Sequence, residues 1–170
     1  RRPLVAEVQS LLTPSAGGSP RRTVSGVDAA RVNMLLAVLQ RRARFALAQD
    51  DCYVATVGGV RLSEPASDLA VAVAVASAKL SAPVPQGMIA VGELGLAGEV
   101  RPVPGIGRRV REAARLGFTR ALVPRSPEPL GEVPAGFTVA EVGSIGEALA
   151  TIPTWTGGGP AARPEVGPGR

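Results

Sequence analysis

The side chains of this chain that could support catalysis are serine, lysine and the acidic residues, because histidine is absent. Without histidine, neither a Ser-His-Asp nor a Cys-His arrangement can form, and the commonest metal ligand is missing. A serine–lysine dyad is still chemically feasible, since a desolvated lysine can act as a base. Lys79 is the single lysine, and it follows Ser67 by 12 residues on one expected helix, roughly 18 Å along the axis. A Ser67–Lys79 dyad is therefore excluded.

The other candidates for chemistry have structural explanations that we favour. Glu64 and Asp68 are one helical turn apart, where acids near a helix start are stabilised by the helix dipole. The motifs Gly95-Leu-Ala-Gly98 and Pro104-Gly-Ile-Gly107 are too short for a phosphate loop, and no Walker-type lysine follows them. Cys52 is the only cysteine, which excludes an internal disulfide and a cysteine-based zinc site. We expect no metal and no cofactor in this chain.

Charge is distributed unevenly along the chain. The formal net charge is +5, and 18 of the 19 basic residues are arginine. Residues 20–61 carry a net +4 and residues 100–125 a net +6, whereas residues 62–99 and 126–156 are acidic, at −3 and −4. Two basic segments favour a polyanionic partner, although a solvated arginine-rich surface explains the charge equally well. With aromatics at only 3%, stacking of bases on a row of aromatic rings is not expected.

The composition suits a protein of the reducing cytoplasm. No apolar run approaches the roughly 18 residues that span a membrane, and the N-terminus lacks the order of a signal peptide. We therefore expect a soluble chain with no membrane partner. Because the chain starts at Arg1 without a methionine, we also expect it to be a piece of a longer protein.

The elements that would position these residues alternate between strands and helices. Periodicity and turn signals predict strands at 4–12, 23–27, 52–57, 88–91, 99–100, 120–123 and 137–142, and helices at 28–42, 67–80, 106–116 and 144–150. Asp28 and Ser144 are expected N-caps, and the helix at 67–80, apolar nearly all round, should be the buried centre. The prediction is one α/β (α+β) domain over residues 4–154 with a mixed sheet and packed helices, a loose segment at 1–3 and a disordered tail at 155–170.

Three segments carry a resemblance to a known family. They are Asp28-Ala-Ala-Arg-Val-Asn-Met-Leu-Leu-Ala-Val-Leu-Gln-Arg-Arg42, Val57-Gly-Gly-Val-Arg-Leu-Ser-Glu-Pro-Ala-Ser-Asp-Leu-Ala70, and Gly92-Glu-Leu-Gly-Leu-Ala-Gly-Glu-Val-Arg-Pro-Val103 with its continuation over 108–118. In this order, the chain from about residue 4 to 150 resembles the C-terminal, Lon-protease-like domain of the RadA/Sms family of bacterial DNA recombination and repair proteins. The resemblance implies the Lon proteolytic-domain fold, which is like domain 2 of ribosomal protein S5.

The same resemblance implies that the protease chemistry is lost. In Lon the nucleophile lies in a Gly-Pro-Ser-Ala-Gly motif, and the matching run here, from Glu64 to Asp68, places Ala66 at the nucleophile's position. Counting 43 positions onward to the place of the catalytic lysine reaches Arg109, which stays protonated and cannot be a base. Ser67 is displaced by one position, which turns its side chain by roughly 100°. An ion pair of Arg109 with Glu64 or Asp68 is a hypothesis.

By resemblance, the parent protein has a zinc motif and a RecA-like ATPase core and forms a ring, expected to be a homohexamer, that acts on DNA in recombination and branch migration. A RecA-type recombinase is an implied partner. The chain itself is expected to bind single- or double-stranded DNA non-specifically. The arginines chosen for DNA contact are those at strand ends, a helix start and a hairpin: Arg22, Arg31, Arg61 and Arg101.

Two alternative functions are considered. In the first, the domain is purely architectural and makes no DNA contact. In the second, which we favour least, it is an active Lon-like serine peptidase that uses Ser67.

Overall fold

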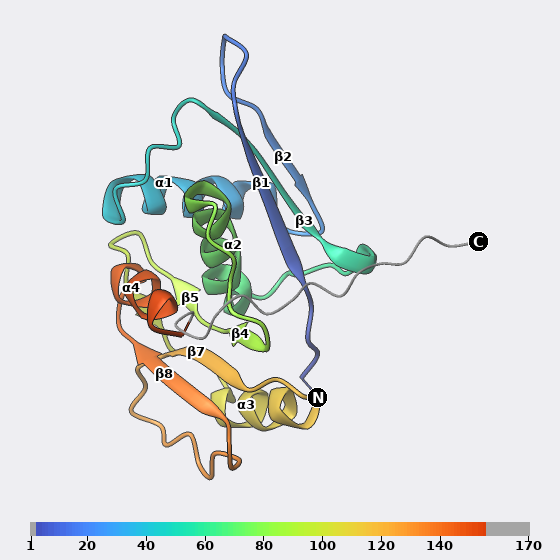
Figure 1. The fold of residues 1–170 in the computed structure, drawn as a ribbon, viewed down its shortest axis with the longest axis vertical. Coiled ribbons are helices and arrows are strands. Elements are labelled where there is room, and N and C mark those ends of the chain that lie inside the picture. The colour runs from blue at the N-terminus through green and yellow to red at the C-terminus, as the bar shows by residue number, and fades with distance from the viewer. Residues whose placement is uncertain (1–2, 156–170) are drawn as a thin grey trace, which may run out of the picture.

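Residues 3–155 are described by a computed structural model (Figure 1). Its strands are β1 (Val8–Pro14), β2 (Arg22–Ser25), β3 (Asp50–Thr56), β4 (Met88–Ala90), β5 (Glu93–Leu94), β6 (Val100–Arg101), β7 (Arg120–Pro124) and β8 (Thr138–Val142). Its α-helices are α1 (Ala29–Arg42), α2 (Asp68–Leu80), α3 (Ile106–Arg115) and α4 (Ile145–Trp155), and short 3-10 turns cover Val57–Gly59 and Pro65–Ser67. The predicted α/β class is confirmed.

The first sheet has the strand order β1-β3-β2. β1 runs antiparallel to β3, whereas β2 runs parallel to it, since α1 lies in the connection between β2 and β3 and returns the chain to the same end of the sheet. One face of this sheet packs on α1 and α2, through Cys52 and Val54 of β3. On the opposite face, Leu11 of β1 is exposed.

The second sheet, β4-β7-β8, is parallel throughout. Its central strand β7 is buried on both faces, as expected for a parallel sheet covered by helices. Leu122 of β7 belongs to the main core around α2, while its neighbours Ala121 and Val123 belong to a smaller core with Ile106 and Val110 of α3. β5 and β6 form a separate two-stranded hairpin. The prediction of one mixed sheet was therefore incomplete, because the strands divide between two sheets and a hairpin.

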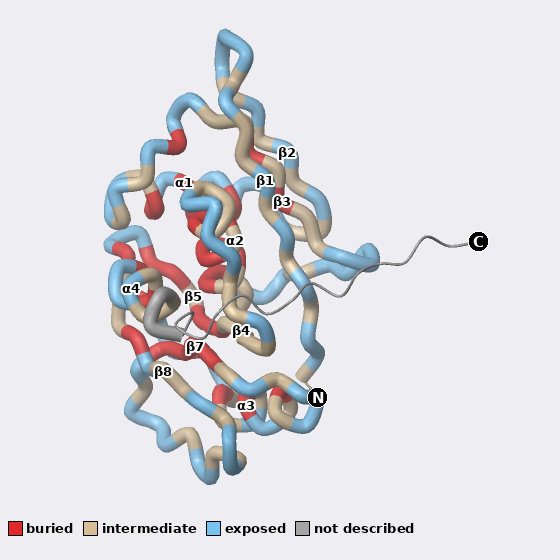
Figure 2. The backbone as a smooth tube through the Cα atoms, viewed as in Figure 1, coloured by how far each residue is buried: buried red, intermediate tan, exposed pale blue. Residues whose placement is uncertain are grey.

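Helix α2 lies at the centre of the molecule, between the two sheets (Figure 1), and its buried residues continue into β5 and β7 (Figure 2). Seven of its thirteen residues are buried, among them Leu69, Val71 and Val75. This confirms the helix expected to be the buried centre. The helix ends at Ser81, which adopts a left-handed conformation with φ of 50°.

The ends of the predicted domain fall partly outside the described residues. Residues 1–2 and 156–170, which make up most of the predicted loose segment and disordered tail, are not described. Trp155, the first residue of the predicted tail, is the last residue of α4. Within residues 3–155, no helix is long and apolar enough to cross a membrane.

Candidate functional site

The N-terminal ends of α1 and α2 meet at a buried ion pair. Asp28 caps α1 by accepting a hydrogen bond from the Arg31 N–H at 2.7 Å, which confirms the predicted cap and places Arg31 in the first turn. The Arg31 guanidinium then donates two hydrogen bonds to Asp68, from Nε to Oδ1 at 2.6 Å and from Nη2 to Oδ2 at 2.5 Å. Asp68 is 1% exposed, and among the described residues it is the only buried charged side chain. A fork-to-carboxylate pair is the strongest geometry for such a contact.

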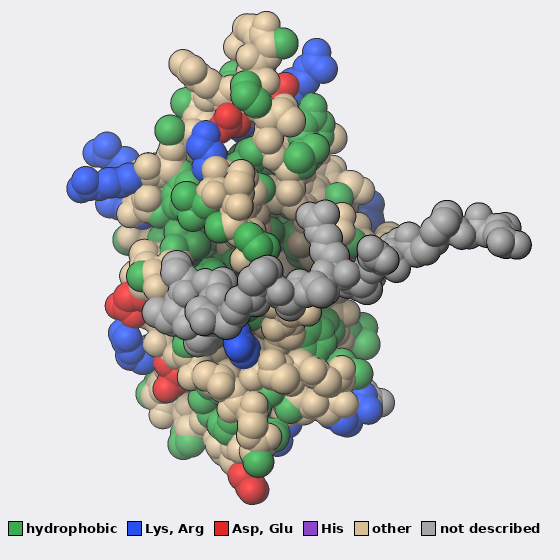
Figure 3. Space-filling view, viewed as in Figure 1, with side chains coloured by type: hydrophobic (Ala, Val, Ile, Leu, Met, Phe, Trp, Pro, Cys, Tyr) green, Lys and Arg blue, Asp and Glu red, His purple; other side chains and the backbone are tan. Residues whose placement is uncertain are grey.

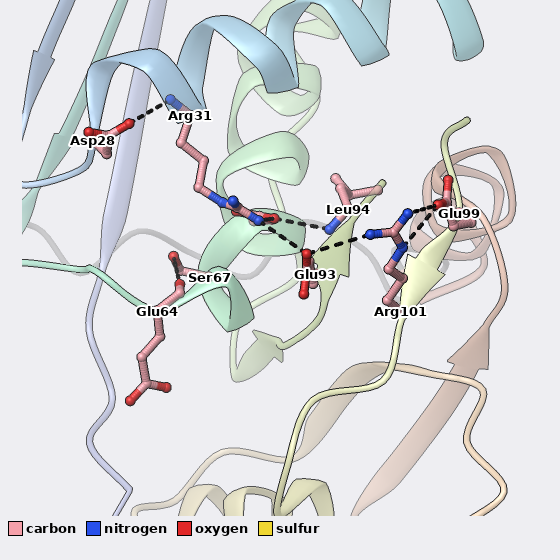
Figure 4. Close-up of polar contacts among 9 residues, drawn as sticks. Asp28, Arg31, Glu64, Ser67, Glu93, Leu94, Glu99 and Arg101 are labelled. Atoms are coloured by element: carbon pink, nitrogen blue, oxygen red, sulfur yellow. Dashed lines mark hydrogen bonds and ion pairs between the residues drawn. The ribbon is translucent and has the colours of Figure 1, made fainter. Parts of the chain in front are cut away.

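The same pair fixes the β5–β6 hairpin. The Leu94 N–H donates to Asp68 Oδ2 at 3.0 Å, so the first residue of α2 holds β5 directly. Figure 4 shows Arg31 reaching from α1 toward this point, with Glu93 beside it. The hydrogen bond to Asp68, opposed by desolvation, raises the pKa of Arg31 above its ordinary value. Asp68 thus joins α1, α2 and β5 at one buried point.

A more exposed chain of charges continues from this pair along the hairpin. Glu93 lies 3.7 Å from Arg31 and 3.8 Å from Arg101. Arg101 in turn pairs with Glu99 at 2.5 Å, and Figure 4 shows Arg101 between Glu93 and Glu99. The backbone N–H of Glu99 itself and then the Arg101 guanidinium lower the pKa of Glu99. Together with Met34 of α1, these residues line a shallow groove of about 410 Å³.

The two positions matched to the protease dyad lie at α3, since Ala66 is in the turn before α2 and packs against α3, and Arg109 is on α3. Ala66 is buried in the smaller core with Ile106 and Val110. Arg109 pairs with Glu64, from Nη2 to Oε2 at 2.8 Å, so the hypothesis of an ion pair with one of the two carboxylates is confirmed for Glu64. This pair is at the surface, since 69% of the Glu64 side chain is exposed.

Ser67 has no base beside it among the described residues. Its hydroxyl donates to the Glu64 carbonyl in the preceding turn, at 2.9 Å. Lys79 lies at the opposite end of α2, where its Nζ is 2.6 Å from Asp50. The prediction that Ser67 and Lys79 do not meet is confirmed. Within residues 3–155, no group of three or more potential ligand side chains could hold a metal ion.

The four arginines chosen for DNA contact have different surroundings. Arg22 points inward and donates to the Asp50 carbonyl and, at 3.2 Å, to the Leu47 carbonyl. Arg31 is held by Asp68. Arg101 has a half-exposed side chain although it pairs with Glu99, and Arg61 is exposed and follows the 3-10 turn at Val57–Gly59. Arg31 and Arg101 therefore share a neighbour, Glu93, whereas Arg22 and Arg61 make no ion pair with this group of charges within residues 3–155.

The sequence reasoning missed the main feature of this region, which is the Arg31–Asp68 pair. Asp68 had been explained as one of two acids near a helix start, with Glu64 as its neighbour. In the structure the two carboxylates take different arginines, 37 and 45 residues away along the chain. The available signal was the apolar surroundings of Asp68, since a charged residue within a buried helix needs a partner.

Comparison with known proteins identifies the family. Residues 37–127, more than half of the chain, match the family model described as subunit ChlI of Mg-chelatase. The chain is 53% identical to the DNA repair protein RadA of Mycobacterium tuberculosis (strain CDC 1551 / Oshkosh), over 88% of this chain and 30% of that protein. It is 49% identical to the DNA repair protein RadA of Mycolicibacterium smegmatis, over 89% of this chain and 32% of that protein.

A more distant relative gives the same result. The DNA repair protein RadA of Streptococcus pyogenes serotype M6 is 44% identical over 89% of this chain and 33% of its own length. The chain thus spans about a third of the length of the curated relatives it matches. The chain belongs to the family that the ChlI model describes, and over most of its own length it is a relative of the DNA repair proteins named RadA.

Proposed function

We propose that this chain is the C-terminal, Lon-like domain of a RadA/Sms-type DNA repair protein, that it binds DNA non-specifically without catalysing a reaction, and that it supports a homohexameric ring for branch migration. The observation that carries the proposal is the identity of 44–53% over nearly nine tenths of the chain with proteins named for DNA repair. The exposed arginines support the DNA-binding part of the proposal, because phosphate binding needs positive charge and no particular base sequence.

A non-catalytic role agrees with the geometry at the two dyad positions. The methyl group of Ala66 has no nucleophilic atom, and it is buried against α3. Arg109 stays protonated at neutral pH and is paired with Glu64. Ser67 uses its hydroxyl within its own turn. No residue described here offers the nucleophile–base contact that peptide hydrolysis requires, and no cofactor is part of the proposal.

Among the arginines chosen from the sequence, the structure favours Arg61 and Arg101 as DNA contacts over Arg22 and Arg31. Arg61 makes no ion pair within residues 3–155, and Arg101 keeps 53% of its side chain exposed while its partner Glu99 is itself at the surface. Arg22 and Arg31 would have to leave internal acceptors to reach a phosphate. Six copies at +5 each would carry about +30 in a ring, a charge whose attraction for DNA falls with salt.

The test is DNA binding by fluorescence anisotropy across a salt series, with the mass in solution measured by light scattering. We expect binding that weakens steeply with salt, in a particle of about six chains. Arg61→Gln should weaken binding to every sequence equally and lower the salt slope by about one. Glu64→Gln, an exposed change of the opposite sign, is the control and should not weaken it.

Other results would change the proposal. Absence of binding at low salt, in a particle of several chains, would leave the purely architectural role. Cleavage of casein by the chain, abolished by Ser67→Ala, would revive the peptidase and contradict the non-catalytic assignment. Arg31→Glu is unsuitable as a test of DNA contact, since it places a second carboxylate against buried Asp68.

A further inference from the structure

The C-terminal end of α1 carries three arginines within four positions. Arg41 and Arg42 form its last turn, and Arg44 follows the cap residue Ala43. All three arginines are exposed, and residues 29–49 contain no aspartate or glutamate. Figure 3 shows basic side chains gathered at the end of α1, projecting from the molecule. We call these three residues the α1-end cluster.

The charge of the cluster is not neutralised by the nearest part of the fold. Arg42 Nε donates to the Leu96 carbonyl at 3.2 Å, which places the tip of the β5–β6 hairpin beside the cluster. Glu99, the acidic residue of that tip, pairs with Arg101 instead, and its second oxygen accepts from the Ala97 N–H at 3.1 Å. Arg41 and Arg44 make no ion pair within the described residues 3–155.

Arg44 has a left-handed backbone conformation, which is unfavourable for arginine. Its φ is 60°, and Ser81 is the only other non-glycine residue with positive φ among residues 3–155. The turn lets the Phe45 N–H return to the Leu39 carbonyl at 3.2 Å, the same carbonyl that accepts from Ala43. Glycine would make this turn without steric cost, and asparagine tolerates it well. An arginine at this position leaves the backbone strained, and such strain is often found where the side chain has a function.

Helix capping explains only part of this arrangement. Cations near a helix C-terminus are favoured by the dipole, and that explains Arg41 and Arg42. It does not explain a third arginine placed beyond the helix end, at a backbone position better suited to glycine. Phe45, the aromatic residue that follows Arg44 in the chain, is packed against the core and so is not displayed for stacking on bases. Exposed guanidinium groups without aromatic neighbours suit phosphate oxygens.

We propose that Arg41, Arg42 and Arg44 form a binding surface for the phosphate backbone of DNA. This inference rests on the proposed function and adds a location to it, at residues outside the four chosen from the sequence. Three guanidinium groups at one helix end provide several donors for phosphate oxygens. The turn at Arg44 keeps this third arginine exposed within two residues of the helix end that carries the other two.

The test distinguishes the effect of the Arg44 charge on DNA affinity from the effect of its backbone conformation on stability. Arg44→Asn removes the charge and relieves the strain, so the melting temperature should rise by about 2–4 °C while the affinity for DNA falls about five- to tenfold. The probes are a fluorescein-labelled 30-mer of dT and a 30-base-pair duplex, titrated with the unsubstituted chain and its variants between 50 and 200 mM salt. The combined change Arg41→Gln with Arg44→Asn should lower the salt slope by about two.

The matched control is Arg108→Gln, which removes the same charge from an exposed position on α3. It should change affinity by less than about twofold. A raised melting temperature with unchanged affinity in Arg44→Asn would overturn the inference and leave the proposed function intact. Equal losses in Arg44→Asn and Arg108→Gln would also overturn it, because only net charge would then matter. No binding by the unsubstituted chain would contradict the proposed function itself.

Discussion

The two ends of α1 both carry arginine, yet the rest of the fold treats them differently. At the N-terminal end, Arg31 pairs at 2.5 Å with Asp68, whose side chain is 1% exposed. The second carboxylate near Arg31, that of Glu93, is 3.7 Å away. At the C-terminal end, Arg42 donates to the Leu96 carbonyl, and none of Arg41, Arg42 and Arg44 pairs with a carboxylate within residues 3–155. The first end joins three elements of the core, while the second presents charge outward.

This difference shows that residue type alone does not tell which arginines are paired inside the fold and which are left exposed at its surface. The distinguishing feature is the partner contributed by a distant segment. Asp68 arrives at Arg31 from 37 residues away, whereas the hairpin tip that reaches Arg42 offers a carbonyl, because Glu99 is held by Arg101. A stability defect should therefore follow changes at one end of α1 and a DNA-binding defect should follow changes at the other.

The largest expected effect comes from breaking the buried pair. Asp68→Ala leaves Arg31 without its partner and the Leu94 N–H without its acceptor, and should cost about 3–5 kcal/mol of unfolding free energy. Chemical denaturation with urea measures this change. Glu64→Ala, which removes an exposed acid four residues earlier, is the matched control. Equal losses in the two variants would show that burial of Asp68 is not what matters.

A smaller effect is expected when the charge at Arg31 is kept but its shape is lost. Arg31→Lys replaces a planar fork with a single ammonium group, which cannot donate to both Asp68 oxygens in the same way. We expect a loss of about 1–2 kcal/mol, measured by the same denaturation. A variant as stable as the unsubstituted chain would mean that simple charge compensation is enough at this site.

The exposed pair near the dyad positions should contribute less. Arg109→Gln removes the partner of Glu64, whose side chain is 69% exposed, and surface pairs of this kind contribute about 0–1 kcal/mol. Thermal unfolding of the variant should therefore differ little from that of the unsubstituted chain. A loss as large as that of Asp68→Ala would contradict the contrast between buried and exposed pairs in this molecule.

The smallest expected effect is the loss of stability at acidic pH that comes from Glu99. Because hydrogen bonds from its own N–H and then from Arg101 lower the pKa of folded Glu99 below the ordinary 4.5, its contribution to stability is complete above that value. The contribution is lost as pH falls through the lowered folded pKa. The stability difference between the unsubstituted chain and Glu99→Gln should therefore shrink between pH 6 and pH 3. A difference that grows on acidification would have the wrong sign for this account.

Local patterns predicted most of the helices of this fold. The apolar spacing and the Asp28 cap placed α1 at its observed bounds, and the apolar run after Ser67 located α2. The Ser144 cap was also correct, since its hydroxyl accepts from the Glu147 N–H. These signals are readable because helix formation depends on neighbours three and four residues apart.

Strand pairing and the ion-pair partners could not be read in this way. The division into two sheets depends on contacts such as β4 with β7, whose strands are separated by the hairpin and α3. The inward turn of Arg22 depends on carbonyls supplied by the segment that enters β3. The left-handed backbone at Arg44 is likewise visible only in the structure, because arginine carries no local signal for positive φ.

We propose that the two ends of α1 serve different purposes, the N-terminal end stability and the C-terminal end DNA binding. The direct measurement is a paired comparison of Arg31→Lys and Arg44→Asn, with unfolding free energy and DNA affinity determined on the same samples at 100 mM salt. We predict that Arg31→Lys loses stability and keeps its affinity, while Arg44→Asn gains stability and binds DNA more weakly. If both variants lose affinity in proportion to lost stability, or neither changes affinity, the claim is contradicted.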